Sequence, residues 1–169
     1  AVSMPVFQTA NYLSAAEQNY RDIPYIRLNN TPNHQALNHK LSAIAGGEDA
    51  LVTASGMAAI STTLLSCMNP GDHLIAQRCL YGGTVTLLTN LLGEHGVTVD
   101  FVSGFETADW TGAITPSTRA IYVESLSNPL MNLLDFEGIL QLAREKQLIS
   151  IIDNTFMTPV NFRPLEIGL

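Results

Sequence analysis

Basic residues, cysteines and long hydrophobic runs are all scarce in this sequence of 169 residues. Eight lysines and arginines against fifteen acidic residues give a net charge of −7, so we expect no nucleic-acid surface, because phosphate binding needs clustered cations. The apolar runs stop short of the roughly 18 residues that span a membrane, so no membrane segment is expected. Cys67 and Cys79 lack Cys-x-x-Cys spacing, which argues against a disulfide framework or zinc site and favours a reducing, cytoplasmic setting.

The composition, 46% hydrophobic and 14% charged, is that of one ordinary globular domain. From the apolar periodicity we expect strands at 50–53, 73–77, 97–102, 120–123 and 148–152, and helices at 33–45, 58–68, 85–92, within 109–118 and at 133–146. Residues 1–27 show no sustained period and are interpreted as an arm. The alternation of strands and helices predicts an α/β fold with a mostly parallel sheet and helices on both faces.

The last predicted strand ends in a carboxylate, Asp153. Its apolar run indicates a strand that is covered on both faces, as in parallel sheets. Because ligands of such sheets bind beyond the carboxyl ends of the strands, Asp153 is a candidate functional residue. The alternative is an aspartate that only caps the following turn. Asp153 taken alone does not decide between the two.

A second candidate is the turn Ser55-Gly56-Met57, between a predicted strand and helix. Small residues there let backbone N–H groups at the helix start approach an anion, as in phosphate sites. Serine is equally common as a helix N-cap, so a structural interpretation has similar weight. The turn matches neither the G-x-G-x-x-G nor the Walker pattern, and this argues against a nucleotide site.

Two further strand ends offer polar or aromatic groups. Tyr81 precedes Gly82 and Gly83, which would let a flat ligand ring and the backbone approach closely. A surface tyrosine in a turn is the alternative. Glu124 and Asn128 follow the next strand and supply a carboxylate and an amide, although Asn-Pro alone would mark a turn.

Together, four strand ends would deliver an anion site, a flat ring, an acid with an amide, and Asp153. This combination suits a planar, phosphorylated cofactor that contains nitrogen. A carboxylate facing a pyridine nitrogen keeps that nitrogen protonated, because a nearby opposite charge favours the ionised form. The protonated ring is then an electron sink, as in pyridoxal phosphate.

Seven short motifs occur in order along the chain: Tyr25-Ile26-Arg27, Gly46-Gly47-Glu48, 54–60, 70–73, 81–84, 124–129 and 153–159. In this order they resemble the motifs of the Cys/Met metabolism family of pyridoxal-phosphate enzymes. That family includes cystathionine γ-synthase, cystathionine lyases, methionine γ-lyase and O-acetylhomoserine sulfhydrylase. The resemblance implies the first part of an aspartate-aminotransferase-like (fold type I) domain that binds pyridoxal 5′-phosphate.

The resemblance also implies roles for individual residues at the phosphate and on the ring face. By similarity, Gly56 and Met57 donate backbone N–H groups to the cofactor phosphate, with Ser55 beside them. Tyr81 would stack on the pyridine ring and assist proton transfer at the leaving group. Both Tyr81 and Asp153 are therefore catalytic candidates.

Further roles follow from the same resemblance. Asp153 would pair with the ring nitrogen, and Thr155 and Asn128 would hold the side of the ring. Tyr25 and Arg27 resemble the pair that reaches the phosphate of the neighbouring subunit in a homotetramer built as a dimer of dimers. Arginine suits that task because its fork can take two phosphate oxygens.

The implied activity is β- or γ-elimination or replacement on an amino-acid substrate: cystathionine, methionine or O-acylhomoserine. In the family a Schiff-base lysine follows the aspartate by about 25 residues. The chain ends at Leu169, before such a position, and its only lysines are Lys40 and Lys146. We therefore expect an arm and helix at 1–48 that contact a partner subunit. We expect 49–169 to be the first part of the cofactor domain, truncated before the lysine and inactive alone.

Two alternatives to this enzyme remain open from the sequence. One is a non-catalytic, degenerate module that binds the cofactor weakly or binds only a partner subunit. The other is an unrelated doubly wound domain whose strand-end residues coincide with the pattern.

Overall fold

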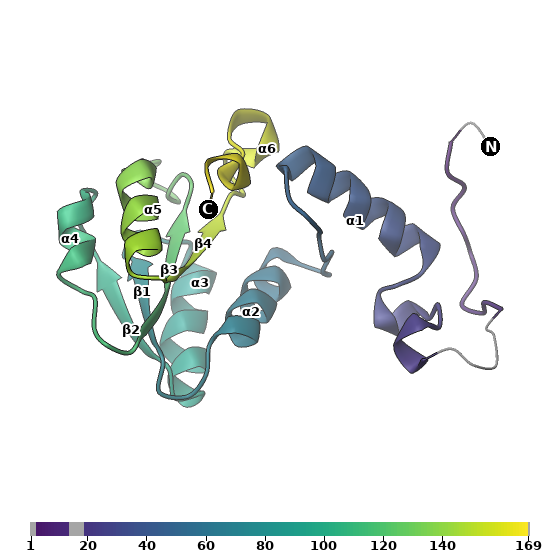
Figure 1. Cartoon of the computed structure of the whole chain (residues 1–169), viewed down its shortest axis with the longest axis horizontal. Helices are drawn as coiled ribbons and strands as arrows, with labels where there is room; N and C mark the ends of the chain where they lie inside the picture. Colours follow the sequence, from purple (N-terminus) through teal and green to yellow (C-terminus); the bar gives the residue numbers. More distant parts are fainter. Residues whose placement is uncertain (1–2, 14–18, 169) are drawn as a thin grey trace. The chain divides into compact units, whose positions relative to one another are not determined.

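The computed structural model describes residues 3–13 and 19–168. The chain divides into two compact units, Ala1–Val52 and Thr53–Leu169, and each is described by itself. In the first unit, the described helices are two short 3₁₀ turns, η1 (Tyr20–Asp22) and η2 (Ile26–Leu28), and the longer α1 (Pro32–Ala45) (Figure 1). Pro32 opens α1, and Gly46, with a φ of 75°, ends it in the left-handed region. The predicted helix at 33–45 is confirmed.

An extended segment accompanies α1 in the first unit. The Asn33 side chain accepts a hydrogen bond from the Phe7 N–H (3.0 Å) and donates one to the Phe7 carbonyl (2.8 Å). Met4, Pro5 and Val6 lie in a shallow depression with residues of α1. One asparagine at the helix start therefore fixes the backbone of the segment.

The predicted strand at 50–53 is wrong, since these residues form no strand. The Val52 N–H donates to Asn38 Oδ1 (3.2 Å), and the Val52 carbonyl accepts from Asn29 Nδ2 (3.1 Å). Two asparagine side chains of the same unit thus satisfy the N–H and the carbonyl that Val52 would offer to a neighbouring strand. Leu51, the residue before Val52, is exposed.

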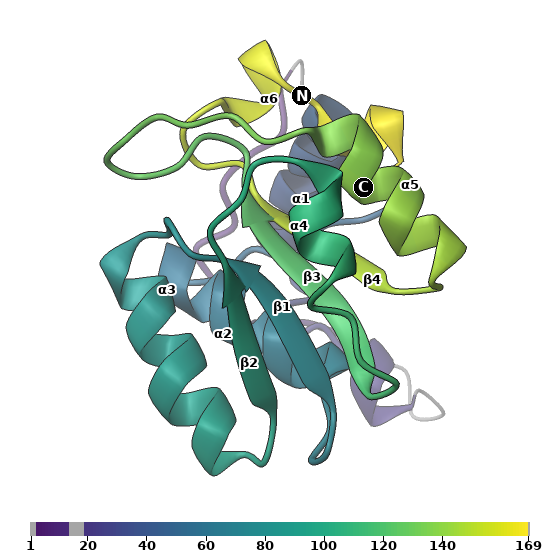
Figure 2. The ribbon, with the colours of Figure 1, turned by 90° about the vertical axis from the view of Figure 1, so that its left-hand side faces the viewer.

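The second unit is built on a parallel sheet with the order β2-β1-β3-β4. Its strands are β1 (His73–Gln77), β2 (Thr98–Val102), β3 (Thr118–Glu124) and β4 (Ile149–Asp153). Every pair is parallel, which confirms the predicted α/β class (Figure 2). Ile149 and Ile151 of β4 pack into the core on one face of the sheet and Ile152 into the core on the other, so the predicted covering of both faces is confirmed. Each residue of β4 is only partly buried, because β4 is an edge strand of the described sheet, paired with β3 alone.

Helices cover both faces of this sheet, as predicted (Figures 1 and 2). They are α2 (Gly56–Cys67), α3 (Gly82–Thr86) with a π-helical continuation η3 (Leu87–Leu92), α4 (Thr107–Thr111), α5 (Phe136–Glu145), α6 (Thr158–Asn161) and the 3₁₀ turn η4 (Pro164–Ile167). Alternate strand residues face opposite ways. Leu74 and Tyr122 pack with α2 and η3, while Ile75 and Val123 pack with α4 and α5. The sheet therefore lies between two apolar cores.

Two helix starts differ from the predicted positions because of local contacts. The expected turn at 81–84 is already the first turn of α3, with Tyr81 in the N-cap position. α5 begins at Phe136, because Asp135 Oδ1 accepts the Gly138 N–H (3.0 Å) and Oδ2 accepts the Thr107 hydroxyl (2.9 Å). A β-carbon at Gly138 would overlap both Thr107 Oγ1 and Asp135 Oδ2, so this capped turn needs a glycine.

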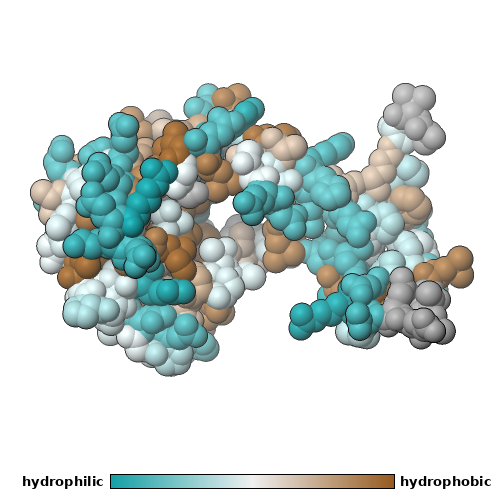
Figure 3. Space-filling model, in the orientation of Figure 1, coloured by the Kyte–Doolittle hydropathy of each residue, from teal (hydrophilic) through white to brown (hydrophobic). Residues whose placement is uncertain are grey.

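The surface of each unit mixes hydrophilic and apolar side chains (Figure 3). Within the described ranges, no helix has the length and apolar character required to cross a lipid bilayer. Cys67 ends α2 and Cys79 follows β1; both are free thiols, in agreement with the expectation that they form no disulfide.

The Asp135 cap gives a stability test. We expect Asp135→Ala to lower the free energy of unfolding by about 1 kcal/mol, the usual cost of losing an N-cap. Asp135→Asn keeps an acceptor for the Gly138 N–H and should cost less. Urea unfolding of the three proteins at neutral pH measures the difference.

The same variants should respond to acid. The Gly138 N–H bond, and then the Thr107 hydroxyl, lower the pKa of Asp135 in the folded protein. The stability that the ionised Asp135 carboxylate adds to the folded protein is therefore complete above its pKa in the unfolded state, and it is lost as the pH falls through its pKa in the folded state. The difference in the free energy of unfolding between wild type and Asp135→Ala should therefore become smaller in acid. A difference that does not change with pH would contradict the role of the ionised Asp135 carboxylate as the cap.

Candidate functional site

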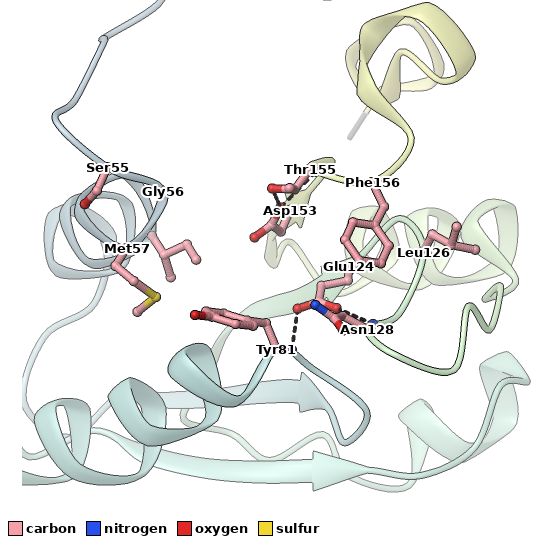
Figure 4. Close-up of a pocket in the computed structure, with 11 residues that line it drawn as sticks. Ser55, Gly56, Met57, Tyr81, Glu124, Leu126, Asn128, Asp153, Thr155 and Phe156 are labelled. Carbon is pink, nitrogen blue, oxygen red and sulfur yellow. Dashed lines mark hydrogen bonds between the residues drawn. The ribbon is translucent and has the colours of Figure 1, made fainter.

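A pocket of about 330 Å³ opens at the carboxyl ends of β1, β3 and β4, within the size range of small-molecule sites. Its lining includes Ser55, Gly56, Met57, Ile60, Tyr81, Glu124, Leu126, Asn128, Asp153, Thr155 and Phe156 (Figure 4). The structure thus brings together seven of the nine residues predicted from the sequence: Ser55, Gly56, Met57, Tyr81, Asn128, Asp153 and Thr155. Three strand ends build it rather than four, because 50–53 is not a strand.

The start of α2 supplies free backbone donors to this pocket. Ser55 is the N-cap, and its hydroxyl accepts the Ala58 N–H (3.1 Å). The N–H groups of Gly56 and Met57 have no acceptor within the described part of the chain. They can therefore bind an anion, which the helix dipole also favours. Ser55 caps the helix, so its structural interpretation and the anion site are both compatible with the geometry.

Tyr81 extends into the pocket from the start of α3, with its ring toward Met57 (Figure 4). Tyr81 is half exposed, at 49%, and lines the pocket, so its side chain is accessible to a ligand. A β-carbon on Gly83 would lie 2.6 Å from Tyr81 Cε1 and 3.1 Å from Met57 Sδ, whereas one on Gly82 would meet nothing within 4 Å. Only the second glycine of the pair is therefore required for the position of the ring.

Glu124, at the end of β3, is buried in the pocket wall with 5% exposure. Its Oε1 accepts the Tyr81 N–H (2.7 Å) and its Oε2 accepts the Asn128 N–H (3.1 Å). The pKa of Glu124 is raised above its usual value, chiefly by burial and also by the nearby Asp153, although the two N–H bonds lower it. The sequence showed a carboxylate here but gave it no separate role, because its partners are backbone groups of two different loops.

Asp153 lies beside Glu124 at the same sheet edge, since the two residues are register partners of β4 and β3. Asp153 Oδ1 accepts the Thr155 N–H (2.9 Å) and the Thr155 hydroxyl. Oδ2 is 3.5 Å from the Tyr122 hydroxyl, whose pKa burial raises far above its usual value, so the phenol stays protonated. Oδ1 of Asp153 thus caps the turn that follows β4, as the structural interpretation expected, while Oδ2 can still bind a ligand.

The remaining two predicted residues, Tyr25 and Arg27, belong to the first unit. The Arg27 guanidinium donates to the Tyr25 hydroxyl, and its Cζ lies 5.4 Å from the centroid of the Tyr25 ring. The two side chains form one cationic group with further N–H donors on the guanidinium.

Apolar lining residues complete the pocket and were missed by the sequence analysis. They are Ile60, Leu126 and Phe156. Leu126 and Phe156 stand inside the motifs at 124–129 and 153–159, and Ile60 lies one helical turn after Met57, so a weak signal existed for each. In the described residues no group of three or more histidines, cysteines and acids could hold a metal ion.

The donor set fits a flat, phosphorylated pyridine. Two unpaired N–H groups can meet a phosphate, an accessible tyrosine face can meet a ring, and the available oxygen of Asp153 can meet a protonated nitrogen. Apolar walls separate these polar groups, as is usual in cofactor pockets.

Comparison with known proteins agrees with this chemistry. The family model for the Cys/Met metabolism PLP-dependent enzymes matches residues 1–169. Cystathionine β-lyase of Bacillus subtilis is 35% identical over 169 residues, which cover 100% of this chain and 43% of the relative. The crystal structure of cystathionine γ-lyase from Lactobacillus plantarum, complexed with L-serine, matches with a TM-score of 0.92 at 35% identity and covers 100% of this chain and 44% of that chain.

A third similar protein carries the cofactor. A Campylobacter jejuni structure assigned as an O-acetylhomoserine (thiol)-lyase contains pyridoxyl-lysine phosphate; it matches with a TM-score of 0.89 at 30% identity, over 100% of this chain and 43% of that one. The fold is therefore fold type I, as predicted. The chain spans about half the length of the curated relatives it matches. By its sequence over all 169 residues and by its fold, the chain belongs to the Cys/Met metabolism family of pyridoxal-phosphate-dependent enzymes.

Proposed function

We propose that the enzyme containing this chain is a lyase or transferase of sulfur amino acid metabolism. Its substrate would be cystathionine, methionine or an O-acylated homoserine, and its reaction a β- or γ-elimination or replacement. The observation that carries the proposal is the convergence of the α2 N–H groups, Tyr81 and Asp153 on one pocket. The names of two relatives that are 35% identical to this chain, cystathionine β-lyase and L-methionine γ-lyase, support this choice of substrates.

Each pocket residue then has a definite task. The N–H groups of Gly56 and Met57 would bind the cofactor phosphate, and Ser55 would keep them in place by capping α2. The Tyr81 ring would cover one face of the pyridine and, through its hydroxyl, assist proton transfer at the leaving group. Pyridoxal phosphate, when bound, supplies the electron sink for this chemistry.

At the other end of the pocket, Asp153 would hold a proton on the ring nitrogen with the oxygen that Thr155 does not occupy. The two bonds from Thr155 orient the carboxylate, and Asn128 would contact the side of the ring. A charge in this half-buried position acts through a lower dielectric than water and is therefore effective.

We further propose that residues 1–169 alone bind the cofactor without turning over substrate. The pocket lining contains no lysine. Lys146 is the C-cap of α5 and precedes β4, whose opposite end holds Asp153, and Lys40 lies in α1 of the first unit. The 169-residue polypeptide should therefore bind pyridoxal phosphate reversibly in equilibrium dialysis, without a Schiff base, and release no product; turnover by it would overturn this point.

The proposal includes a partner subunit. Several apolar side chains of α1 are exposed: Leu37, Leu41 and Ile44 are 45%, 41% and 48% accessible. Such a surface suits contact with a second copy of the chain. We propose a dimer of dimers in which Tyr25 and Arg27, already joined to each other, serve the phosphate of the neighbouring subunit.

The first test concerns the charge of Asp153. In the complete enzyme, Asp153→Asn should lower kcat by at least about a hundredfold, because the electrostatic partner of the ring is lost. The amide keeps the shape and can still accept from Thr155, so the fold should persist. Steady-state kinetics and equilibrium dialysis of pyridoxal phosphate measure both effects.

Asp100 provides the matched control for this test. It is an exposed acid on β2, at the edge of the sheet opposite β4, and its Oδ2 lies 3.4 Å from His73 Nε2. Asp100→Asn should leave kcat at the wild-type level. Wild-type activity in Asp153→Asn would instead remove the acid from the mechanism.

The second test removes one phosphate donor without disturbing the helix. Gly56 is the first residue of α2, where proline is tolerated, and Ser55 before it is already extended at ψ 161°. Gly56→Pro deletes the N–H and should weaken pyridoxal phosphate binding by about ten- to a hundredfold, the range for a hydrogen bond to a charged group.

Gly56→Ala is the control for the added bulk. A β-carbon at position 56 meets nothing within 4 Å in the protein, and the N–H remains. Fluorescence titration with pyridoxal phosphate should show near-wild-type affinity for Gly56→Ala. Equal affinity of Gly56→Pro and wild type would show that the helix start does not bind the phosphate.

The third test asks whether Arg27 acts across subunits. Arg27→Ala and Asp153→Ala should each inactivate the enzyme when expressed alone. In a hybrid, the intact pocket of the Arg27→Ala subunit receives Arg27 from its partner, so the hybrid dimer purified after co-expression should have about half of the activity of a dimer with two working sites. If Arg27 served its own pocket, both sites of the hybrid would be defective and no activity would return.

A further inference from the structure

We propose that Glu124 is a positioning residue whose single carboxylate sets the places of both Tyr81 and Asn128 beside the cofactor ring. The proposal rests on the function given above, since it assigns Glu124 a task within the same site. Glu124 itself need not touch the reacting atoms. It acts through two residues that come from different loops.

The contacts of Glu124 join these loops to the sheet. Tyr81 follows β1 and Asn128 follows β3, and their N–H groups occupy Oε1 at 2.7 Å and Oε2 at 3.1 Å. Figure 4 shows both bonds leaving one carboxylate between the tyrosine ring and the asparagine. Because both hydrogen bonds hold backbone N–H groups, a shift of the Glu124 carboxylate would move the backbone of Tyr81 and of Asn128, and their side chains with it.

The base of Glu124 is itself held. Its backbone N–H donates to Gln77 Oε1 (3.1 Å), and Gln77 is 2% exposed. With Glu124 at 5% exposure, little water can replace its bonds to the loops. A buried carboxylate that lost one of its two hydrogen bonds would be costly in free energy. The end of β3 and the loops with Tyr81 and Asn128 should therefore keep the arrangement in which both bonds form.

A carboxylate is the side chain that this arrangement requires. It has two acceptor oxygens and, when ionised, no donor, which matches two N–H donors. Glutamine of the same size would place an NH₂ donor against one of the two N–H groups. Aspartate keeps both acceptors but is one methylene shorter. Glu124→Gln therefore changes the hydrogen-bond pattern and the charge at the original reach, whereas Glu124→Asp changes the reach alone.

Ser127 offers a matched control in the same loop. It is fully buried, and its hydroxyl accepts the Asn132 N–H at 2.9 Å. Ser127→Ala therefore removes a buried bond from side chain to backbone, like Glu124→Gln, but its partner is neither Tyr81 nor Asn128.

Hydrogen–deuterium exchange in the complete enzyme tests the first half of the proposal, with and without pyridoxal phosphate. In Glu124→Gln the amide of Tyr81 or of Asn128 should exchange about tenfold faster than in wild type, as expected for a lost buried hydrogen bond. In Ser127→Ala the Tyr81 amide should keep its wild-type rate. Unchanged rates at both amides in a folded Glu124→Gln enzyme would overturn the proposal.

The second half is tested on the loaded enzyme by kinetics and by the circular dichroism of the bound cofactor, which reports the chiral placement of its ring. Glu124→Gln should lower kcat about tenfold with a smaller change in KM, since a misplaced ring disturbs the transition state more than binding. The cofactor dichroism should fall with it, and Glu124→Asp should recover part of both. A lower melting temperature with wild-type kcat and dichroism would reduce Glu124 to a structural residue.

Failure of this inference is separable from failure of the proposed function. If wild-type enzyme does not bind pyridoxal phosphate, or if Asp153→Asn remains fully active, the function itself is refuted whatever Glu124 does. If wild type binds the cofactor and turns over, but Glu124→Gln changes neither amide exchange nor dichroism, only the positioning role falls.

Discussion

β3 and β4 pair in parallel with Glu124 opposite Asp153, and the pocket depends on this register. Register partners in neighbouring strands point to the same side of a sheet, so the two acids meet at one edge. A slip of β4 by one residue would turn Asp153 to the opposite face and put the neighbouring side chain in its place. Such a slip would also move Ile149 and Ile151 out of the core that they share with Tyr122, and Ile152 out of the core that it shares with Val123.

The two acids of this register pair differ in what surrounds them. Glu124 is buried, and both its oxygens accept backbone N–H groups. Asp153 is partly exposed and directs one oxygen to Thr155, with the other available toward the pocket. Two unpaired carboxylates so close would repel each other. Both oxygens of Glu124 are occupied by the Tyr81 and Asn128 N–H groups, so of the two acids it is Asp153 that directs an oxygen toward the pocket.

The sequence predicted the elements that rest on local periodicity and missed those that rest on contacts between distant residues. β1 was predicted within its observed bounds, and β3, β4 and α1 were placed to within a few residues. The apolar run at 50–53 looked like a strand, but a strand needs a partner, and Asn29 and Asn38 bind its backbone instead. Periodicity contains no information on such competitors.

Among the site residues, the same limit applies. Tyr81, Asn128 and Asp153 could be placed at strand ends because parallel strands deliver their carboxyl ends to one edge. The task of Glu124 could not be found, since its partners are main-chain N–H groups, which every residue except proline possesses. The role proposed for Tyr25 and Arg27 at a neighbouring subunit rests on the family resemblance and not on the periodicity or the strand ends of this chain.

The structural and functional interpretations of these motifs also proved compatible. The Ser55 hydroxyl satisfies the third N–H of α2, and in doing so it holds the helix start in a geometry where the first two remain free. One oxygen of Asp153 caps the turn that follows β4, and this fixes the direction of the other oxygen. A capping residue therefore both completes local structure and orients the groups that it leaves unpaired. For that reason, evidence that a polar residue caps a helix or a turn does not count against a role for it in binding.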